Sequence, residues 1–460
     1  MRNRTEIKMK KRGRVGLGLL GTVGLLAGAL AIITTSPVSA SAPGTNIVCS
    51  AGGVNGAADV VTINLAPTEG YMSTPDGNSL YMWSYGEESE PGAGDATFQT
   101  PAPTICVDEG DTVTVNLTVP GGWPTIPTGS GVDTPVSIIF PGQTVTTSGG
   151  SPGFLTAEAS GGTVSYTFTP TAGTYLYEGG TNSALHVAMG MYGSVVVYPK
   201  DGTTAYGPGT EYDTDREFLL MLHSVDPGEH QTMEYWTSAD PFSYVPEPYE
   251  KVGFTGLLDP PGTIRHERYW TINGRSNPDT LWPNNTPLMP NQPYGSVIHV
   301  EAQDPADPGL PALVRYTNAS LDNHPFHPHG NSLKLIAQDG QTLGLGDGLE
   351  IFTSTVGSGQ TYDLMVEWLD VNGFDSTFNP IPVTLPGLNN LVFKDDSSTY
   401  SGSPYLGEKG ELPAPVTQFN ACGEYYFPWH SHALWEIQNF DEGFGGMLTL
   451  WRVDPIGGCQ

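Results

Sequence analysis

The sequence predicts an all-β protein in which the same β-domain occurs twice. Its 460 residues include 59 glycines and 40 prolines, a content that argues against long helices and favours short strands joined by turns. Short runs of β-branched, aromatic and polar residues recur between Gly- and Pro-rich clusters, and the motif order of the first half returns in the second. With 38% hydrophobic residues, the chain can build more than one core.

Eight runs are predicted to be strands, because each combines high β-propensity with a short span. They are Thr112–Val119, Thr163–Phe168, Glu217–Leu222, Tyr269–Ile272, Ser296–Val300, Ala312–Thr317, Ser332–Ile336 and Thr361–Val366.

Paired motifs indicate the duplication. Gly173–Tyr177 and Gly423–Phe427 each read as a strand that is followed by a loop and a closing strand with alternating large side chains. Upstream, Val136–Gly142 takes the place in the first half that Pro325–Gly330 takes in the second.

The N-terminus has the features of a secretory signal. Seven of the 18 Lys and Arg residues lie between Arg2 and Arg14, the apolar run Val15–Ile33 follows, and small residues precede a cleavage point after Ala40. An uncleaved membrane anchor is the alternative, since this run could span a bilayer. Export would place the mature chain in the periplasm, at the cell surface or outside the cell, and no other stretch could cross a membrane.

These signals divide the chain into five parts. We expect a signal peptide at residues 1–40, a first domain at 41–200, a linker at 201–210, a second domain at 211–455 and a tail at 456–460. The second domain is long for one β-sandwich. Its Pro-, Tyr- and acid-rich stretch Pro227–Pro261 is therefore interpreted as an insertion, with the remnant of a third domain as the alternative.

The net charge narrows the classes of partner that the protein can bind, and the four cysteines bear on the compartment in which it folds. A formal net charge of −30 repels phosphate backbones and anionic lipid, so nucleic acid is a poor partner and cations, metal ions or basic proteins are better ones. In an oxidising compartment four cysteines are expected to pair, and they allow three connectivities. We predict Cys49–Cys106 and Cys422–Cys459, one disulfide in each domain.

Two short segments contain five of the ten histidines. They are His324, His327 and His329 in the first segment and His430 and His432 in the second. Residues two apart in a strand point to the same face, so each His-x-His pair can aim two imidazoles at one point. An isolated pair is more often a polar surface strand, but two pairs in one domain favour a site for copper, zinc or iron at His327, His329, His430 and His432.

The motifs around these histidines resemble those of the multicopper oxidases, exported proteins built of cupredoxin β-sandwiches. The resemblance rests on His-Pro-Phe-His-x-His-Gly at 324–330, Phe-x-x-His-x-His at 427–432 and the later Gly446-Met447. It covers nearly the whole mature chain, including Tyr269–Ser276 and Ser358–Thr361. It implies two cupredoxin-like Greek-key β-sandwich domains and, by analogy with related two-domain oxidases, allows a homotrimer.

The resemblance also implies roles for single residues of the second domain. His324 would be a ligand of the blue (type 1) copper, and the other four histidines would serve the type 2 and type 3 coppers. Ser431 stands where the family has the blue-copper cysteine, and Glu436 stands where it has a histidine. A hydroxyl supplies no soft thiolate, so no normal blue-copper centre is expected. His324 and Glu436 would be additional ligands of the residual site or groups that support its ligands.

The first domain departs further from the family. Ile139 and Pro141 stand where imidazoles would be, and Tyr177–Gly180 contains no histidine, so a three-copper cluster cannot be assembled within this chain. His186 and the nearby Met191 resemble half of a copper loop without its cysteine, and packing at a sandwich edge is the favoured interpretation.

Three functions are consistent with this pattern, which is similar to that of a degenerate bacterial branch of the family. The leading one is a secreted protein that binds a metal at the residual histidine site; copper is the first choice, and zinc would also fit. The second is a copper-dependent oxidoreductase acting on metal ions or phenols. The third is a structural cell-surface or extracellular protein that has lost the copper chemistry.

Overall fold

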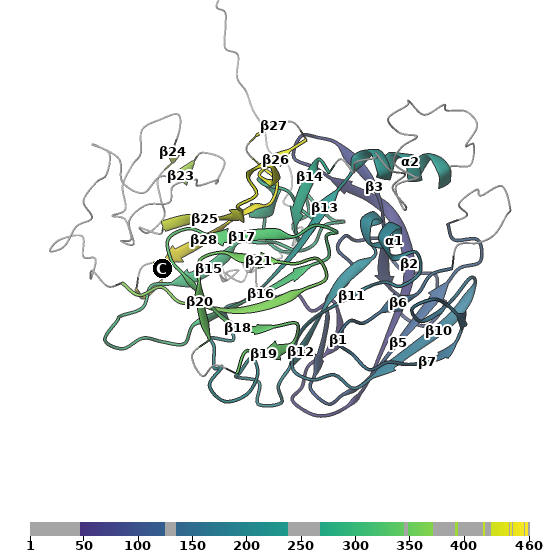
Figure 1. Cartoon of the computed structure of the whole chain (residues 1–460), viewed down its shortest axis with the longest axis horizontal. Coiled ribbons are helices and arrows are strands. Elements are labelled where there is room, and N and C mark those ends of the chain that lie inside the picture. The colour runs from purple at the N-terminus through teal and green to yellow at the C-terminus, as the bar shows by residue number, and fades with distance from the viewer. Residues whose placement is uncertain are drawn as a thin grey trace, which may run out of the picture. The chain divides into compact units, whose positions relative to one another are not determined.

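The computed structural model describes residues 47–124, 135–237, 267–344, 348–370, 392–393, 417–418, 425–440, 442–443, 445–454 and 456–458. Strands dominate these segments, as predicted, and they form two cupredoxin-like Greek-key β-sandwiches (Figure 1). The predicted signal peptide, Cys422 and Cys459 lie outside the described residues.

The N-terminal sandwich consists of two five-stranded sheets. The first has the order β1 (Ala51–Gly53), β4 (Ile105–Asp108), β12 (Tyr192–Tyr198), β11 (Gly173–Gly179) and β6 (Ile138–Ile139). The second has the order β3 (Ser79–Glu87), β2 (Val60–Ser73), β5 (Thr112–Val119), β10 (Gly162–Phe168) and β7 (Thr146–Gly149), and β8 (Ser151–Pro152) pairs separately with β9 (Ala157–Glu158). In β5 the valines and leucine point inward and are buried, while the threonines and asparagine between them face outward.

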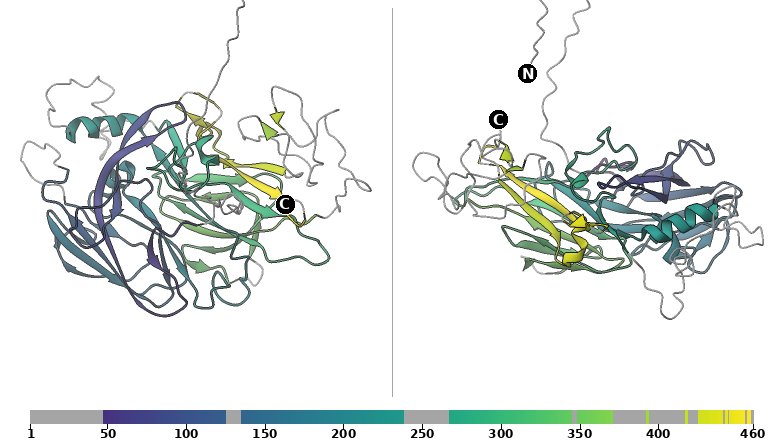
Figure 2. Two further views of the ribbon diagram at one scale, coloured as in Figure 1. Left: turned by 180° about the vertical axis from the view of Figure 1, so that it is seen from behind. Right: turned by 90° about the horizontal axis from the view of Figure 1, so that it is seen from above.

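The C-terminal sandwich also consists of two sheets. One has the order β15 (Ile298–Glu301), β28 (Leu448–Asp454), β25 (Tyr425–Ser431), β17 (His324–Pro328) and β21 (Ser354–Val356). The other has the order β19 (Gln341–Thr342), β18 (Leu333–Gln338), β22 (Thr361–Val366), β16 (Ala312–Asn318), β13 (Glu217–Val225), β14 (Tyr269–Ile272), β26 (Gln438–Asn439) and β27 (Glu442–Gly443), with β20 (Leu349–Ile351) paired to β18. A further pair joins β23 (Val392–Phe393) to β24 (Thr417–Gln418). Both views of Figure 2 show β25 and β28, in yellow, lying side by side.

The strand orders confirm the predicted duplication. The run β4-β12-β11-β6 corresponds to β15-β28-β25-β17, and in each run the first two strands are parallel. The run β3-β2-β5-β10-β7 corresponds to β14-β13-β16-β22-β18. In each run the second and third strands are parallel, β2 with β5 and β13 with β16. Parallel neighbours in an otherwise antiparallel sheet require crossovers between the two layers, as in Greek-key sandwiches.

All eight predicted strands are present, and β5, β14 and β22 have the predicted bounds. The long strand β2 and its partner β3 were not predicted. Pro67 and Gly70 interrupt the pattern of β2, and both residue types are rare inside strands. The pairing of β2 with β5 runs only from Val60 to Leu65, so Pro67 and Gly70 lie in the part of β2 that pairs with β3 alone, where a residue without an N–H donor is tolerated.

Helices are few among the described residues. They comprise α1 (Ser183–Met189), α2 (Pro227–Thr237) and the 3-10 turns η2 (Asp279–Leu281) and η3 (Leu434–Glu436). None of them is long and apolar enough to cross a bilayer. Helix α2 opens the predicted insertion Pro227–Pro261, whose remainder lies outside the described segments.

The predicted disulfide between Cys49 and Cys106 is confirmed. It ties the chain before β1 to β4, with the two Cα atoms 5.5 Å apart. The predicted pairing of Cys422 with Cys459 concerns residues that the structure does not describe.

A buried polar network joins the two sandwiches. Arg315 on β16 is fully buried and donates to Glu217 at 2.6 Å, to Thr174 on β11 at 2.9 Å and to Asp363 on β22 at 3.3 Å. Tyr206 also donates to Asp363, so the predicted linker packs against the C-terminal sandwich. These contacts cross the boundary where the sequence predicts a linker.

Candidate metal site

The pairing of β17 with β25 brings the two His-x-His pairs together. His327 lies opposite His430, and the neighbouring pair on the other face is Phe326 opposite Ser431. Phe326 and Ser431 are fully buried, so they face the core. Because side chains alternate across a strand, His327, His329, His430 and His432 share the outer face, as the spacing predicted.

The four rings form one cluster. The centroid of the His327 ring lies 5.0 Å from that of His329, 5.1 Å from that of His432 and 5.8 Å from that of His430. The centroid of His430 lies 5.0 Å from that of His329 and 5.9 Å from that of His432. His430 is buried, His327 and His329 are half-buried, and His432 is exposed, so the cluster opens to solvent on one side.

Hydrogen bonds to acceptor oxygens fix two of the four tautomers. Nδ1 of His327 donates to the carbonyl of Phe352 at 2.5 Å and lies 3.0 Å from the hydroxyl of Thr353. Nδ1 of His430 donates to the carbonyl of Ser431 at 2.7 Å. Since a carbonyl can only accept, the hydrogens lie on Nδ1, and each Nε2 carries a lone pair and no hydrogen.

A direct contact between two imidazoles closes the cluster. Nε2 of His329 and Nε2 of His430 are 2.9 Å apart, and because His430 carries its hydrogen on Nδ1, His329 is the donor. Across the described ranges, no three His, Cys, Asp or Glu side chains are arranged to hold a metal ion as they stand.

The environment keeps three of the imidazoles neutral near pH 7. Burial lowers the pKa of His430 to about 4, against an opposing effect of its hydrogen bond to Ser431. Burial also lowers the pKa of His327, and burial together with the neighbouring His327 lowers that of His329. Neutral imidazole is the form that binds a transition metal.

The spacing of the rings can be compared with that of imidazoles around a single ion. With bonds of about 2.0–2.1 Å, two nitrogens on one ion lie about 3 Å apart and their ring centroids about 5 Å apart. The nitrogen separation of 2.9 Å and the centroid separations of 5.0, 5.0 and 5.1 Å are close to these values, whereas those of 5.8 and 5.9 Å are larger. Ion binding would require the hydrogen between His329 and His430 to leave Nε2 of His329, and small ring rotations would complete the set.

The opposite face of the same strands does not fit a blue-copper centre. His324 and Ser431 point inward, as the alternation requires, and both are fully buried. Nδ1 of His324 lies 2.8 Å from Oε2 of Glu436, so the two residues predicted as additional or supporting ligands bind each other. They face away from the four outer imidazoles, and the hydroxyl of Ser431 provides no thiolate.

The corresponding face of the N-terminal sandwich has lost its ligand residues. In the pairing of β6 with β11, Ile139 lies opposite Glu178, at the place where His327 lies opposite His430. Gly179 corresponds to Ser431, and a Cβ added there would lie 2.5 Å from Cβ of His186. A cysteine at position 179 would therefore collide with the neighbouring helix.

His186 is a core residue of the N-terminal sandwich. Its ring is fully buried, lies edge-on to Trp83 at 5.9 Å between centroids, and has no hydrogen-bond partner within the described segments. Burial lowers the pKa of His186 to about 4. The packing is that of an apolar residue, in line with the favoured interpretation of its sequence.

This burial predicts an acid-dependent loss of stability. At pH 8 His186 is neutral in both states, but below the unfolded pKa of about 6.5 the unfolded chain binds the proton first, so folding stability falls towards pH 4. Between pH 8 and pH 5 we expect wild type to lose about 2 kcal/mol more than His186→Met in urea unfolding. Equal losses in the two proteins would contradict this expectation.

The other described histidines, to which the sequence gave no role, lie away from the cluster. The ring nitrogens of His230 face the carbonyls of Tyr81 at 2.6 Å and Ala188 at 3.1 Å. His223 also faces the carbonyl of Ala188, and Nε2 of His299 lies 2.8 Å from Asp454.

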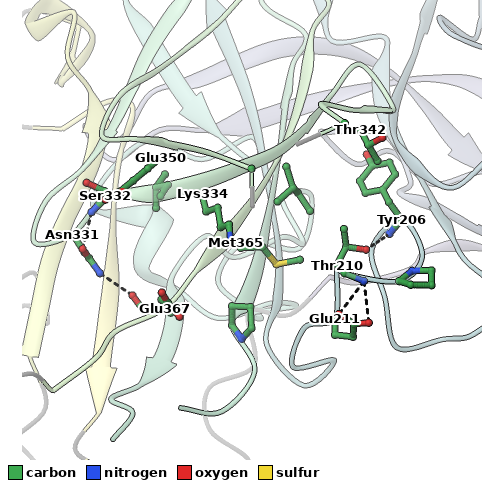
Figure 3. Close-up of a pocket in the computed structure, with 17 residues that line it drawn as sticks. Tyr206, Thr210, Glu211, Asn331, Ser332, Lys334, Thr342, Glu350, Met365 and Glu367 are labelled. Atoms are coloured by element: carbon green, nitrogen blue, oxygen red, sulfur yellow. Dashed lines mark hydrogen bonds between the residues drawn. The ribbon is translucent and has the colours of Figure 1, made fainter. Parts of the chain in front are cut away.

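A cavity of about 840 Å³ lies in another part of the C-terminal sandwich (Figure 3). Lys334, Glu350 and Met365 line it together with Tyr206 and Glu211, and no histidine or cysteine is among its lining residues. It therefore offers no second imidazole site.

Sequence reasoning missed Phe352 and Thr353, which orient His327. They follow β20 and belong to neither histidine motif. Phe352 acts through its backbone carbonyl, which any residue type carries, whereas Thr353 lies near His327 through its side-chain hydroxyl. Phe352 is also 67% exposed beside the His327 ring. No sequence signal could have identified these two residues.

No protein-family model matches the chain, and no curated protein matches it. Solved structures similar to it include a blue copper oxidase from Nitrosomonas europaea, with 19% identity over 85% of each chain and a TM-score of 0.49. The multicopper oxidase mgLAC has 16% identity over 86% of this chain and 87% of its own, with a TM-score of 0.49. The copper nitrite reductase from Nitrosomonas europaea has 14% identity over 86% of this chain and 94% of its own, with a TM-score of 0.45. Since these scores lie below 0.5, the cupredoxin-like architecture is assigned from the sheets of the chain itself.

Proposed function

We propose that the protein binds a single copper ion through His327, His329, His430 and His432. The observation that carries this proposal is the register of β17 with β25, which places four imidazoles on one outer face within 5.0–5.9 Å of their neighbours. The Nδ1 hydrogens of His327 and His430 are held by carbonyls, the arrangement that commonly orients metal-binding histidines.

Copper is the metal that this ligand set favours. Imidazole sites rank copper above the other divalent first-row metals, and the site supplies no carboxylate or thiolate that would favour a different ion. When bound, copper would supply one-electron chemistry. The N-terminal sandwich contributes Ile139 and Glu178 at the corresponding positions, so the described residues offer one residual site rather than a multinuclear cluster.

Export of the protein and the position of its domain boundary belong to the same proposal. The disulfide between Cys49 and Cys106 and the basic, then apolar, N-terminus support an exported protein. We place the boundary between the two domains in residues 201–210, between β12 and β13.

Substitution of the ligands tests the site. We expect one copper ion per chain in wild type, and loss of nearly all bound copper in His327→Ala and in His430→Ala, as measured by elemental analysis after dialysis against copper. His299→Ala is the matched control, because this histidine pairs with Asp454 and lies outside the cluster. Unchanged stoichiometry in both cluster variants would refute the proposal, and zinc loading in parallel would show which metal the site prefers.

A further inference from the structure

A buried hydrogen-bonded pair lies directly behind the imidazole cluster. Nδ1 of His324 donates to Oε2 of Glu436 at 2.8 Å, since a carboxylate only accepts. His324 is fully buried and Glu436 is 3% exposed. Nε2 of His324 has no hydrogen-bond partner in the described part of the chain, so Glu436 is the polar contact that orients this ring.

The pair connects the two segments that carry the four imidazoles. His324 begins β17, three residues before His327, and Glu436 ends the turn η3, four residues after His432. Within η3, Leu434 is 58% exposed, whereas the side chain of Glu436 is buried. The carboxylate is therefore the side-chain anchor that holds this turn against the sheet.

The turn makes further hydrogen bonds through its backbone, one of which goes to a side chain: the N–H of Ala433 donates to the hydroxyl of Ser431 at 3.2 Å. The N–H of His432 donates to the carbonyl of Pro325 at 2.7 Å, and the N–H of Met447 donates to the carbonyl of Glu436 at 2.8 Å. They fix the path of the chain on each side of η3, and the Glu436 side chain holds the turn against the sheet. Loss of the carboxylate should loosen the turn without unfolding the strands.

We propose that His324 and Glu436 are positioning residues whose hydrogen bond cross-links β17 to the segment after β25. The pair contacts no outer imidazole; it acts by holding the strand that carries His327 and the turn next to His432 at a fixed distance. This inference rests on the proposed copper site for its functional consequence, but the cross-link itself is a hydrogen bond between two side chains of the protein.

The test compares two substitutions at one position. Glu436→Gln keeps an amide oxygen that can accept from Nδ1 of His324, whereas Glu436→Ala removes the acceptor. Copper affinity is measured by competition with a chelator, and the copper environment by electron paramagnetic resonance. Two variants serve as controls. Glu350→Ala removes an exposed carboxylate of the same sandwich and controls for charge. Val300→Ala truncates a core residue on β15 and controls for loss of stability.

We expect Glu436→Ala to weaken copper binding by about 10-fold, the lower end of the effect of removing a group bonded directly to a ligand, because the pair acts through the strand and the turn. Its resonance spectrum should indicate fewer equivalent nitrogens, while Glu436→Gln and both controls keep the wild-type spectrum. Wild-type affinity and spectrum in Glu436→Ala would overturn the inference.

Hydrogen exchange in the metal-free protein separates this inference from the proposed function. Glu436→Ala should accelerate exchange of the His432 amide and of η3, and Glu436→Gln should restore protection. If wild type binds no copper but Glu436→Ala still opens the turn, the copper proposal fails and the cross-link stands. If exchange at η3 is the same in wild type, Glu436→Ala and Val300→Ala, the cross-link is refuted whatever the metal content.

Discussion

Copper-loaded wild-type protein is expected to lack the intense visible absorption of a copper–thiolate bond, and the double variant Ser431→Cys with Glu436→His is expected to acquire it. Ser431 and His324 share the buried inner face of β25 and β17, and Glu436 already contacts His324 at 2.8 Å. The N–H of Ser431 donates to the carbonyl of Met447 at 3.0 Å, which places this methionine beside the same position. The substitutions would add a cysteine and a histidine to the existing His324 and Met447, which together make the cysteine, two histidines and weak axial methionine of a blue-copper site.

Absorption spectra of copper-loaded proteins check this prediction. Ser431→Cys alone is the matched control, because Glu436 would still compete for His324. Circular dichroism spectra of the metal-free variants should show retained strands. A correctly folded double variant that binds copper without colour would show that the four positions do not converge, whereas an intense band in wild type would show that another thiolate reaches the metal.

Replacement of Arg315 by methionine is expected to cost about 3–5 kcal/mol of folding stability, because it leaves buried carboxylates without their cation. Arg315 is fully buried, lies 2.6 Å from Glu217 and 3.3 Å from Asp363, and both carboxylates are also nearly inaccessible to solvent. Thr174 and Tyr206 donate to Asp363, so the network couples β11 of the N-terminal sandwich to the C-terminal one.

Urea unfolding of Arg315→Met and Arg216→Met measures the effect of burial on otherwise similar ion pairs. Arg216 donates to Glu301 at 2.9 Å, but both side chains remain more than a quarter exposed, so its loss should cost about 1 kcal/mol or less. Similar losses in the two variants would show that the Arg315 network contributes no more than a surface pair.

Much of the architecture could be predicted because the signals are local. High β-propensity within short spans identified β5, β14 and β22 with their observed bounds, and repeated motifs identified the duplication. Strand β2 escaped prediction, because the proline and glycine inside it break the local pattern and only the pairing with β3 accommodates them. The single disulfide that the structure describes was also predictable, from cysteine number and position.

The candidate site likewise has features that follow from the sequence and features that do not. The spacing of two residues determined that His327 and His329 share a face, that His430 and His432 share a face, and that Ser431 points away from its neighbours. The sequence also determined the loss of a thiolate at position 431 and of imidazoles in the first half. These properties follow from residue identity and from the period of a strand, which are local.

Tertiary structure alone decided that the two pairs meet and how their hydrogens are arranged. Nε2 of His329 and of His430 approach to 2.9 Å across 101 residues of sequence, through a register that no local pattern encodes. The carbonyl of Phe352 that orients His327, and the carboxylate of Glu436 that binds His324, likewise come from segments brought close by sheet packing. Strand periodicity sets the direction of a side chain, but its partner depends on which distant strand lies opposite.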